Sequence, residues 1–293
     1  MKLRTIAAAG LLPLVIIIAL FTPKIVAALC LGIMSAIASY EMLHTTKMVR
    51  HPRMLLYTMI VAFLVAIWSF LGSVAVFAAV IALVFFAMLF TEMMLSGMKI
   101  SYTKCCLCFT AGLILPYMLC AIVRILVQPD GRFFVLVPFA VAFISDSFAY
   151  LVGMKFGKHK LSPVISPNKS VEGVIGGLVG TIIGMVIYGL VLQLGFGFKV
   201  NYFFVIVYAV IGSAASVFGD LCFSVIKRQT NIKDFGNLIP GHGGILDRFD
   251  SMIVVAPLME VLLFLLPMAV KGCYYGKMCV YFGFNRLNWS AEP

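Results

Sequence analysis

The chain has 293 residues, of which 63% are hydrophobic and only 11% are charged. A soluble globular domain carries about a quarter charged residues, so this composition excludes an ordinary soluble protein. The formal net charge of +11 favours attraction to anionic lipid headgroups. The basic residues fall in short segments between apolar runs, so we expect no nucleic-acid partner.

Long apolar runs divide the chain into candidate membrane spans. A helix needs about 20 apolar residues to cross a hydrocarbon core of about 30 Å. Helices are expected because each backbone polar group must be satisfied within the bilayer. We therefore predict an all-α, polytopic helical bundle, and we interpret the first run as a retained helix because no clear signal-peptide cleavage site follows it. The nine predicted spans are 5–22, 25–43, 54–71, 73–95, 106–127, 133–153, 172–195, 202–226 and 252–271.

The distribution of Lys and Arg orients this predicted bundle. If the N-terminus is cytoplasmic, most of the 22 basic residues fall in cytoplasmic segments, so the positive-inside rule favours N-in and C-out. The charged loops 154–171 and 227–251 then face the cytoplasm. We expect a multi-pass protein of the cell's inner (plasma) membrane.

The sequence predicts a single membrane domain over residues 1–293 with three functional parts. Residues 1–130 are membrane-embedding helices with few polar features; we expect Glu41 and Glu92, near span ends, to reach water. Residues 131–271 contain most of the acidic residues and are the predicted catalytic part. Residues 272–293 form a tail on the outer side, where Cys273 and Cys279 could pair in an oxidising compartment; the sequence leaves that pairing open.

Small residues recur three and four apart in the span 172–195. This spacing lets helices pack closely in lipid, and it is also compatible with a homodimer. The residues concerned are Gly173, Gly176, Gly177, Gly180 and Gly184.

The most informative stretch is 224–250, SVIKRQTNIKDFGNLIPGHGGILDRFD, together with Asp220 just before it. Asp220, Ser224, Lys227 and Arg228 follow a helical spacing that places them on one face. A charged side chain at mid-bilayer costs about 2.5–3.5 kcal/mol on insertion scales, so Asp220 is a candidate functional residue. The alternative is a simple ion pair between Asp220 and a nearby Lys or Arg.

Asp247 and Asp250 are three residues apart and share a helical face. A cation would relieve the repulsion between two such carboxylates, and Mg²⁺ prefers oxygen ligands completed by substrate phosphates. The alternative is a solvated helix N-terminus, where acidic residues are favourable. Gly243 and Gly244 could bring backbone N–H groups close to a phosphate; His242 remains a candidate base, nucleotide contact or structural donor.

Two upstream segments add polar residues. Asp146 lies within the sixth predicted span and is a functional candidate by its position. Lys169 and Ser170 precede the start of the next helix, a natural anion site. The alternative for this second segment is an ordinary basic cytoplasmic loop.

Together these residues resemble the signature of the phosphatidate cytidylyltransferases, also called CDP-diacylglycerol synthases. Segments 146–153 and 156–161 also resemble the family, whereas residues 1–100 match only as a hydrophobic pattern. The positions that meet the signature are Ser224, Ile226, Lys227, Arg228, Lys233, Asp234, Gly236, Ile239, Pro240, His242, Gly243, Gly244, Ile245, Asp247, Arg248, Phe249 and Asp250.

The resemblance implies a Mg²⁺-dependent reaction of CTP with phosphatidic acid that yields CDP-diacylglycerol and pyrophosphate. It implies that Asp220, Asp247 and Asp250 hold the metal and that the basic side chains bind phosphate. The catalytic set is then Asp220, Lys227, Arg228, Asp247 and Asp250. The substrate-binding set is Asp146, Lys169, Ser170, Ser224, Lys233, His242, Gly243, Gly244 and Arg248.

Some features depart from the family, and two other classes of function remain. Asn168, Ser170 and Val171 stand where members usually carry other residues, which concerns substrate fit more than reaction type. A CTP-dependent polyprenol or phytol kinase, or an ether-lipid cytidylyltransferase, would also combine membrane helices with nucleotide-handling loops. A secondary transporter could use buried carboxylates such as Glu260, but transporters usually show repeated halves and none is visible.

Overall fold

The structure is a computed structural model that describes residues 20–72, 74–97, 99–236, 238 and 243–271. This part of the chain is mostly helical, as the composition predicts. The helices are α2 (Lys24–Tyr40), α3 (Pro52–Phe70), α4 (Ala75–Leu95), α5 (Tyr102–Phe109), α6 (Leu115–Leu119), α7 (Ala121–Val127), α8 (Gly131–Phe134), α9 (Leu136–Phe156), α10 (Val171–Phe196), α11 (Tyr202–Gln229) and α12 (Leu246–Leu265). Two π-helical turns, η1 (Glu41–Thr45) and η2 (Thr110–Ile114), continue α2 and α5.

Seven helices among the described residues are long and apolar enough to cross a membrane, by length and composition. They correspond to the second through eighth predicted spans. Most of the first predicted span, 5–22, lies outside the described residues, so the predicted number of nine is not confirmed. The spanning segments are Lys24–Thr45, Pro52–Phe70, Ala75–Leu95, Tyr102–Val127, Gly131–Phe156, Val171–Phe196 and Tyr202–Gln229.

The last predicted span, 252–271, needs correction. Its helix, α12, begins at Leu246 and ends at Leu265, so the two acidic residues near its start are helical rather than part of a loop. These acids, together with Arg248 and Glu260, give α12 four charged residues, and α12 is not among the seven apolar helices. Residues Ala269–Lys271 form strand β4 instead of the end of a helix.

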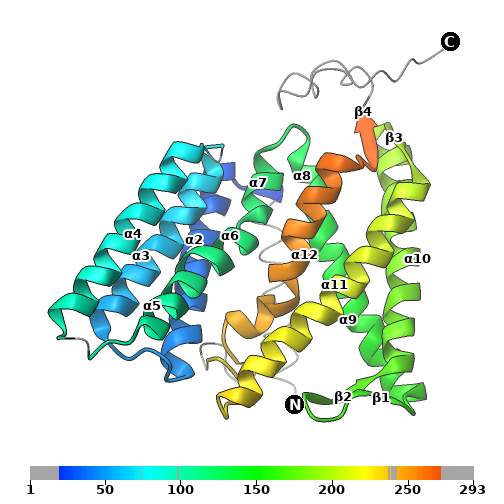
Figure 1. Cartoon of the computed structure of the whole chain (residues 1–293). Helices are drawn as coiled ribbons and strands as arrows, with labels where there is room; N and C mark the ends of the chain where they lie inside the picture. The colour runs from blue at the N-terminus through cyan, green and yellow to red at the C-terminus, as the bar shows by residue number, and fades with distance from the viewer. Residues whose placement is uncertain (1–19, 73, 98, 237, 239–242, 272–293) are drawn as a thin grey trace.

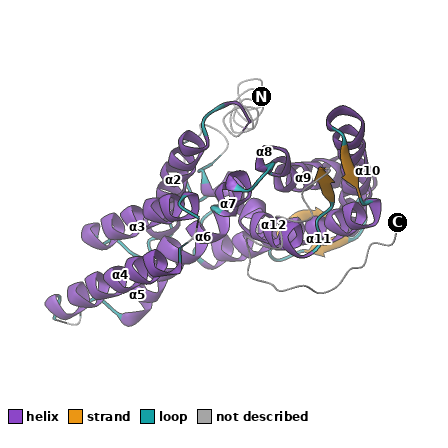
Figure 2. Ribbon diagram, turned by 90° about the horizontal axis from the view of Figure 1, so that it is seen from above, coloured by secondary structure: helices purple, strands orange, loops and turns teal. Residues whose placement is uncertain are grey.

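The helices form two groups that lie side by side (Figure 1). Helices α2 to α6 make one group and α8 to α11 make the other. Helix α12 contacts α6 and α7 as well as α9 and α11, so it joins the two groups. Figure 2 shows the same elongated arrangement from above. A residue at the start of α12 can therefore be reached from both halves of the chain.

The glycine face predicted for the span 172–195 packs within the chain, against α9. A Cβ added to Gly177 would lie 2.8 Å from the Ser145 carbonyl oxygen, and one added to Gly176 would lie 2.5 Å from Val152. Gly180 faces Phe148 just as closely. Small residues here let α9 and α10 approach closely. Packing within one chain therefore explains the glycine spacing that was also compatible with a homodimer.

Two short antiparallel strand pairs, of which the first is a hairpin, supplement the helices and were not predicted. Strands β1 (Lys160–Ser162) and β2 (Ser166–Ser170) pair with Lys160 opposite Ser170. Strand β3 (Phe198–Val200) pairs with β4 at the other end of the bundle (Figure 1). Arg228, at the end of α11, donates from Nε to the Ile165 carbonyl oxygen in the first hairpin, at 3.2 Å. The described parts of the two charged loops therefore lie at the same end, as the sequence predicts.

Candidate active site

Polar side chains gather where α9, α11 and α12 meet the hairpin β1–β2. Helix α11 begins after Asn201, whose side chain accepts hydrogen bonds from two backbone N–H groups of its first turn. Near the other end of α11, a Cβ on Gly219 would lie 3.0 Å from the Asp250 carbonyl oxygen and 3.1 Å from the Ser251 Cα. The absence of a side chain at Gly219 thus lets α12 approach α11 one residue before Asp220.

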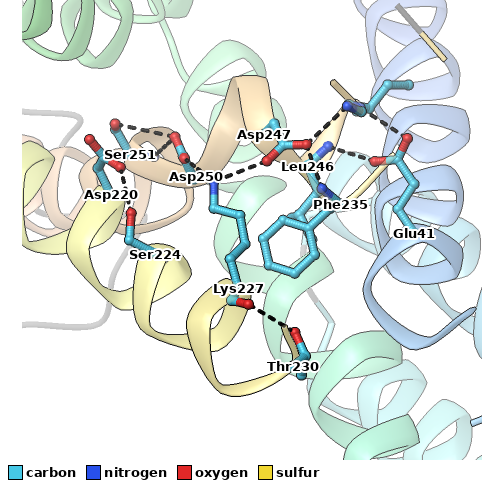
Figure 3. Close-up of polar contacts among 12 residues, drawn as sticks. Glu41, Asp220, Ser224, Lys227, Thr230, Phe235, Leu246, Asp247, Asp250 and Ser251 are labelled. Carbon is cyan, nitrogen blue, oxygen red and sulfur yellow. Dashed lines mark hydrogen bonds and ion pairs between the residues drawn. The ribbon is translucent and has the colours of Figure 1, made fainter. Parts of the chain in front are cut away.

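Lys227 of α11 lies between the two acidic residues at the start of α12 (Figure 3). Its Nζ is 3.0 Å from Asp247 Oδ1 and 3.8 Å from Asp250 Oδ2. The Asp247 side chain is only 3% exposed, and those of Lys227 and Asp250 are each 14% exposed. The ammonium group also lies 5.4 Å from the centre of the Phe235 ring. Two carboxylates therefore share one nearly buried cation. Buried charges need such partners of opposite sign.

Asp247 also holds the loop that precedes α12. Its Oδ2 accepts hydrogen bonds from the backbone N–H of Phe235, at 2.7 Å, and of Gly244, at 3.0 Å. These two donors lie on either side of the stretch that contains the undescribed residues. With Lys227 on Oδ1, the carboxylate has three donors, and it fixes the loop relative to α11 and α12.

Asp220 forms an ion pair with Lys169, which comes from strand β2. Lys169 Nζ lies 2.5 Å from Asp220 Oδ2, and the Ser224 hydroxyl donates to Asp220 Oδ1 at 3.3 Å. The structure thus brings together two segments that the sequence analysis had treated as separate candidates. The simple ion pair considered for Asp220 does form, with a partner about 50 residues away in sequence rather than on its own helix.

Asp146 of α9 completes the polar cluster. Ser216 donates to its Oδ1 at 3.0 Å, and Ser251 donates to its Oδ2 at 3.2 Å. The Ser251 hydroxyl also lies 3.5 Å from Asp250 Oδ1, so it connects the two carboxylates. Asp250 lies within electrostatic reach of both Asp146 and Asp220. We call Asp146, Asp220 and Asp250 the acidic triplet.

Other predicted site residues take different positions. The Ser170 hydroxyl is buried and accepts a hydrogen bond from Gly173 N at 3.2 Å, so it caps α10. This contact accounts for a hydroxyl at that position, and the predicted phosphate contact of Ser170 stays a prediction. Lys233 and Arg248 are exposed, and His242 lies outside the described residues, as do Cys273 and Cys279.

Glu41 contacts the start of α12, a position that the sequence did not predict. We expected it to reach water at the end of a span, but it is 4% exposed and accepts hydrogen bonds from Ile245 N at 3.1 Å and Leu246 N at 2.9 Å. Glu92 was also wrongly expected to reach water: it is 7% exposed and accepts from Tyr57 and Arg53. No local pattern marks either contact, because both depend on how distant helices pack.

Gly243 and Gly244 have contacts with protein carboxylates in this structure. Gly243 has φ +83°, a conformation that favours glycine. A Cβ on Gly244 would collide with the Glu41 carboxylate, and one on Gly243 would lie 2.7 Å from Asp247 Oδ2. The N–H of Gly244 already donates to Asp247. The predicted phosphate contact at these glycines stays a prediction, while their smallness is explained by the two carboxylates.

The donor atoms of the acidic triplet suit a hard cation. They are all oxygens, from three carboxylates and from the hydroxyls of Ser216, Ser224 and Ser251. Within the described ranges, no three His, Cys, Asp or Glu side chains are placed to hold a metal by themselves. Mg²⁺ commonly binds through one or two carboxylates with substrate phosphates completing its shell. The oxygen donors are compatible with that manner of binding, and the Mg²⁺ site stays a prediction.

Comparisons with known proteins show the family to which the chain belongs. The family model described as "Cytidylyltransferase family" matches residues 2–266. A protein of Staphylococcus haemolyticus named phosphatidate cytidylyltransferase is 42% identical over 136 residues, which are 46% of this chain and 51% of the relative. Proteins of the same name from Staphylococcus saprophyticus and Staphylococcus aureus are each 41% identical with the same coverage. The matched region of this chain spans about half the length of these curated relatives.

Proposed function

The chain belongs to the cytidylyltransferase family, and we propose that it transfers CMP from CTP to phosphatidic acid, giving CDP-diacylglycerol and pyrophosphate. The observation that carries this proposal is the alternation of charge at one end of a membrane bundle: Lys169 pairs with Asp220, and Lys227 pairs with Asp247 and Asp250. The ammonium groups of Lys169 and Lys227 can exchange these carboxylate partners for substrate phosphates. The relatives' shared name supports the choice of lipid substrate.

In the proposed reaction, a phosphate oxygen of the lipid attacks the α-phosphorus of CTP. A new P–O bond forms to the lipid phosphate, the bond from the α-phosphorus to the bridging oxygen breaks, and pyrophosphate leaves with that electron pair. No protein nucleophile is required. Catalysis consists of holding the reacting groups in line and neutralising charge that develops on phosphate oxygens. Lys169 and Lys227 are placed to do this, with Arg228 and the exposed Lys233 and Arg248 at the same end.

The carboxylates have two roles in this proposal. Asp220 and Asp250 would hold Mg²⁺, which when bound supplies charge neutralisation on the CTP phosphates. Asp247, the third carboxylate of the expected metal set, would have to release Lys227 or a backbone N–H to join them. Asp247 therefore serves to fix the loop and to orient Lys227. The hydroxyls of Ser216, Ser224 and Ser251 would hold the acidic triplet in place.

We further propose that the charged end faces the cytoplasm of a cell whose plasma membrane holds the protein. The hairpin β1–β2 and the described start of the α11–α12 loop carry Lys160, Lys169 and Lys233, which agrees with the positive-inside rule. CTP would then enter from the cytoplasm and the lipid from the bilayer. The bacterial relatives support the plasma membrane as the location.

The proposal is tested by a turnover assay on purified protein in detergent, with α-labelled CTP, phosphatidic acid and Mg²⁺. We expect label in the lipid phase, and we expect it to fall at least about a hundredfold in Asp220→Asn and Asp250→Asn. The control is Asp130→Asn, a carboxylate near α8, away from the site, which should keep full activity. Unchanged turnover in both site variants would contradict the assignment of the acidic triplet.

No observation favours the alternative classes. Two of the carboxylates that a transporter would need are ion-paired: Arg124 donates to Glu260 in a bidentate pair, with both distances 2.7 Å, and Lys169 holds Asp220. A CTP-dependent lipid kinase would place the γ-phosphate on a lipid hydroxyl, which the same assay distinguishes when the label is moved to the γ position and a polyprenol replaces phosphatidic acid.

A further inference from the structure

Helix α12 begins without a side-chain cap from its own neighbourhood, although its first residues belong to the site. The residue before it, Ile245, is apolar and provides no capping hydrogen bond. The first N–H groups of a helix have no partner within the helix and must be satisfied elsewhere. The partner here is Glu41, 204 residues earlier in the chain than Ile245.

We propose that Glu41 is a positioning residue for the transfer reaction: it caps α12 from the N-terminal group of helices and so fixes the first turn of α12, which carries Asp247. Each of its two carboxylate oxygens accepts one hydrogen bond, from Ile245 N and from Leu246 N. With the bond from Gly244 N to Asp247, three consecutive backbone N–H groups end on two carboxylates. A negative charge at a helix N-terminus is also favoured by the helix dipole.

The shape of the loop indicates that this contact is built in. A Cβ on Gly236 or on Gly244 would collide with the Glu41 carboxylate, so both positions need glycine for the same reason. These glycines lie on either side of the stretch containing the undescribed residues. Glu41 therefore touches the loop at both described ends, as Asp247 does through Phe235 and Gly244.

A continuous series of contacts leads from Glu41 to the acidic triplet (Figure 3). Glu41 holds Ile245 and Leu246; the next residue, Asp247, holds Lys227; and Lys227 reaches Asp250. Loss of the first contact would let the start of α12 shift. A misplacement of about 1 Å can reduce turnover about a hundredfold, because the reacting groups no longer align.

The position of Glu41 in its own helix supports this role. It is the first residue of the π-helical turn η1 (Glu41–Thr45), which follows α2 directly. Single π-helical turns are common at functional sites, where they change the direction of a side chain. Thr46, just after this turn, is buried and donates to the Met42 carbonyl oxygen, so the turn is anchored locally.

The first experiment measures the contact itself, independently of activity. Hydrogen–deuterium exchange of the full protein in detergent would be followed in peptides covering 243–249, for the unaltered chain, Glu41→Gln and Glu92→Gln. Glu92→Gln is the matched control, because Glu92 is an equally buried carboxylate of the same helix group that accepts from Tyr57 and Arg53. We expect exchange at 243–249 to rise at least about tenfold in Glu41→Gln only. Unchanged exchange in that variant would overturn the proposal.

The second experiment rests on the proposed function and separates positioning from general stability. For Glu41→Gln, we expect kcat to fall about 10- to 100-fold, because the start of α12 is misplaced. The KM for CTP should stay within about threefold, because the exposed cations Lys233 and Arg248 remain. Glu41→Asp keeps the charge and should recover part of kcat. Full kcat in Glu41→Gln, or a loss of kcat that Glu41→Asp does not relieve at all, would overturn the positioning role. If the unaltered protein shows no turnover, the proposed function fails, and the exchange measurement alone decides the contact.

Discussion

Replacing Lys227 by Met tests the central charge of the site, because Met keeps the length of the side chain and removes its cation. At an effective dielectric constant of about 20, the attraction is about 5.5 kcal/mol for charges 3.0 Å apart and about 4.4 kcal/mol at 3.8 Å, before desolvation. Desolvation offsets much of this, and removing one partner of a buried pair costs about 3–5 kcal/mol in practice. Since Lys227 retains 14% exposure, we expect a loss of about 3 kcal/mol in the free energy of unfolding.

A double-mutant cycle measures this pair directly, with chemical unfolding in mixed micelles as the assay. The variants are Lys227→Met, Asp247→Asn and the two combined. The double variant leaves no unpaired charge at position 247, and the loss of the cation at Asp250 is common to both variants that lack Lys227. The double variant should therefore be more stable than the sum of the single losses predicts, by about 2 kcal/mol. Additive losses would refute the reasoning. Arg53→Met is the control, because Arg53 is 67% exposed in its pair with Glu92 and such surface pairs contribute about 1 kcal/mol or less.

Two further predictions concern ion pairs that join distant segments. Lys169→Met should lower kcat/KM at least about tenfold in the turnover assay, since it removes the cation that hairpin β1–β2 brings to Asp220. The control is Lys160→Met, which alters an exposed lysine of the same hairpin and should keep activity. Equal losses in both variants would contradict a specific role of Lys169. Arg124→Leu should lower the free energy of unfolding by about 3 kcal/mol, because it leaves Glu260 unpaired. Thermal unfolding checks this prediction, and an unchanged midpoint would show that the pair contributes nothing.

Contacts along one helix were predictable from the sequence. The spacing of Asp220, Ser224 and Lys227 indicated one face of a helix, and in the structure all three belong to the site. Arg228 follows the same spacing but turns toward the hairpin, where it binds the Ile165 carbonyl oxygen. Periodicity therefore identified the helix and its polar face, but the outermost residue of that face took a partner that only the folded hairpin provides.

Contacts between distant segments were not predictable in the same way. The ion pair of Lys169 with Asp220 and the hydrogen bonds of Glu41 to the start of α12 depend on how the helices pack. The glycines offered the one usable signal, since Gly236 and Gly244 imply a close approach. Without the packed helices, that signal is equally compatible with a ligand, and the sequence analysis assigned Gly244 to phosphate for that reason.

The bounds of α12 also could not be predicted from hydropathy. Hydropathy alone placed the last span at 252–271, because charged residues are expensive within a bilayer. The helix instead begins at Leu246 and includes Asp247, Arg248 and Asp250. Lys227 compensates the two carboxylates, and Arg248 is exposed, so these charges are accommodated within the helix. A hydropathy threshold cannot detect such compensation, because the partner is on another helix.

The central claim is the transfer of CMP to phosphatidic acid, and the most direct measurement uses two labels in parallel. Purified protein would receive phosphatidic acid with CTP labelled at either the α- or the γ-phosphorus. We predict that α-label appears in the lipid phase and that γ-label appears in pyrophosphate. In a parallel reaction with a polyprenol, whose hydroxyl a kinase would phosphorylate, γ-label in the lipid would indicate a kinase. No α-labelled lipid from folded protein given phosphatidic acid would contradict the proposed function.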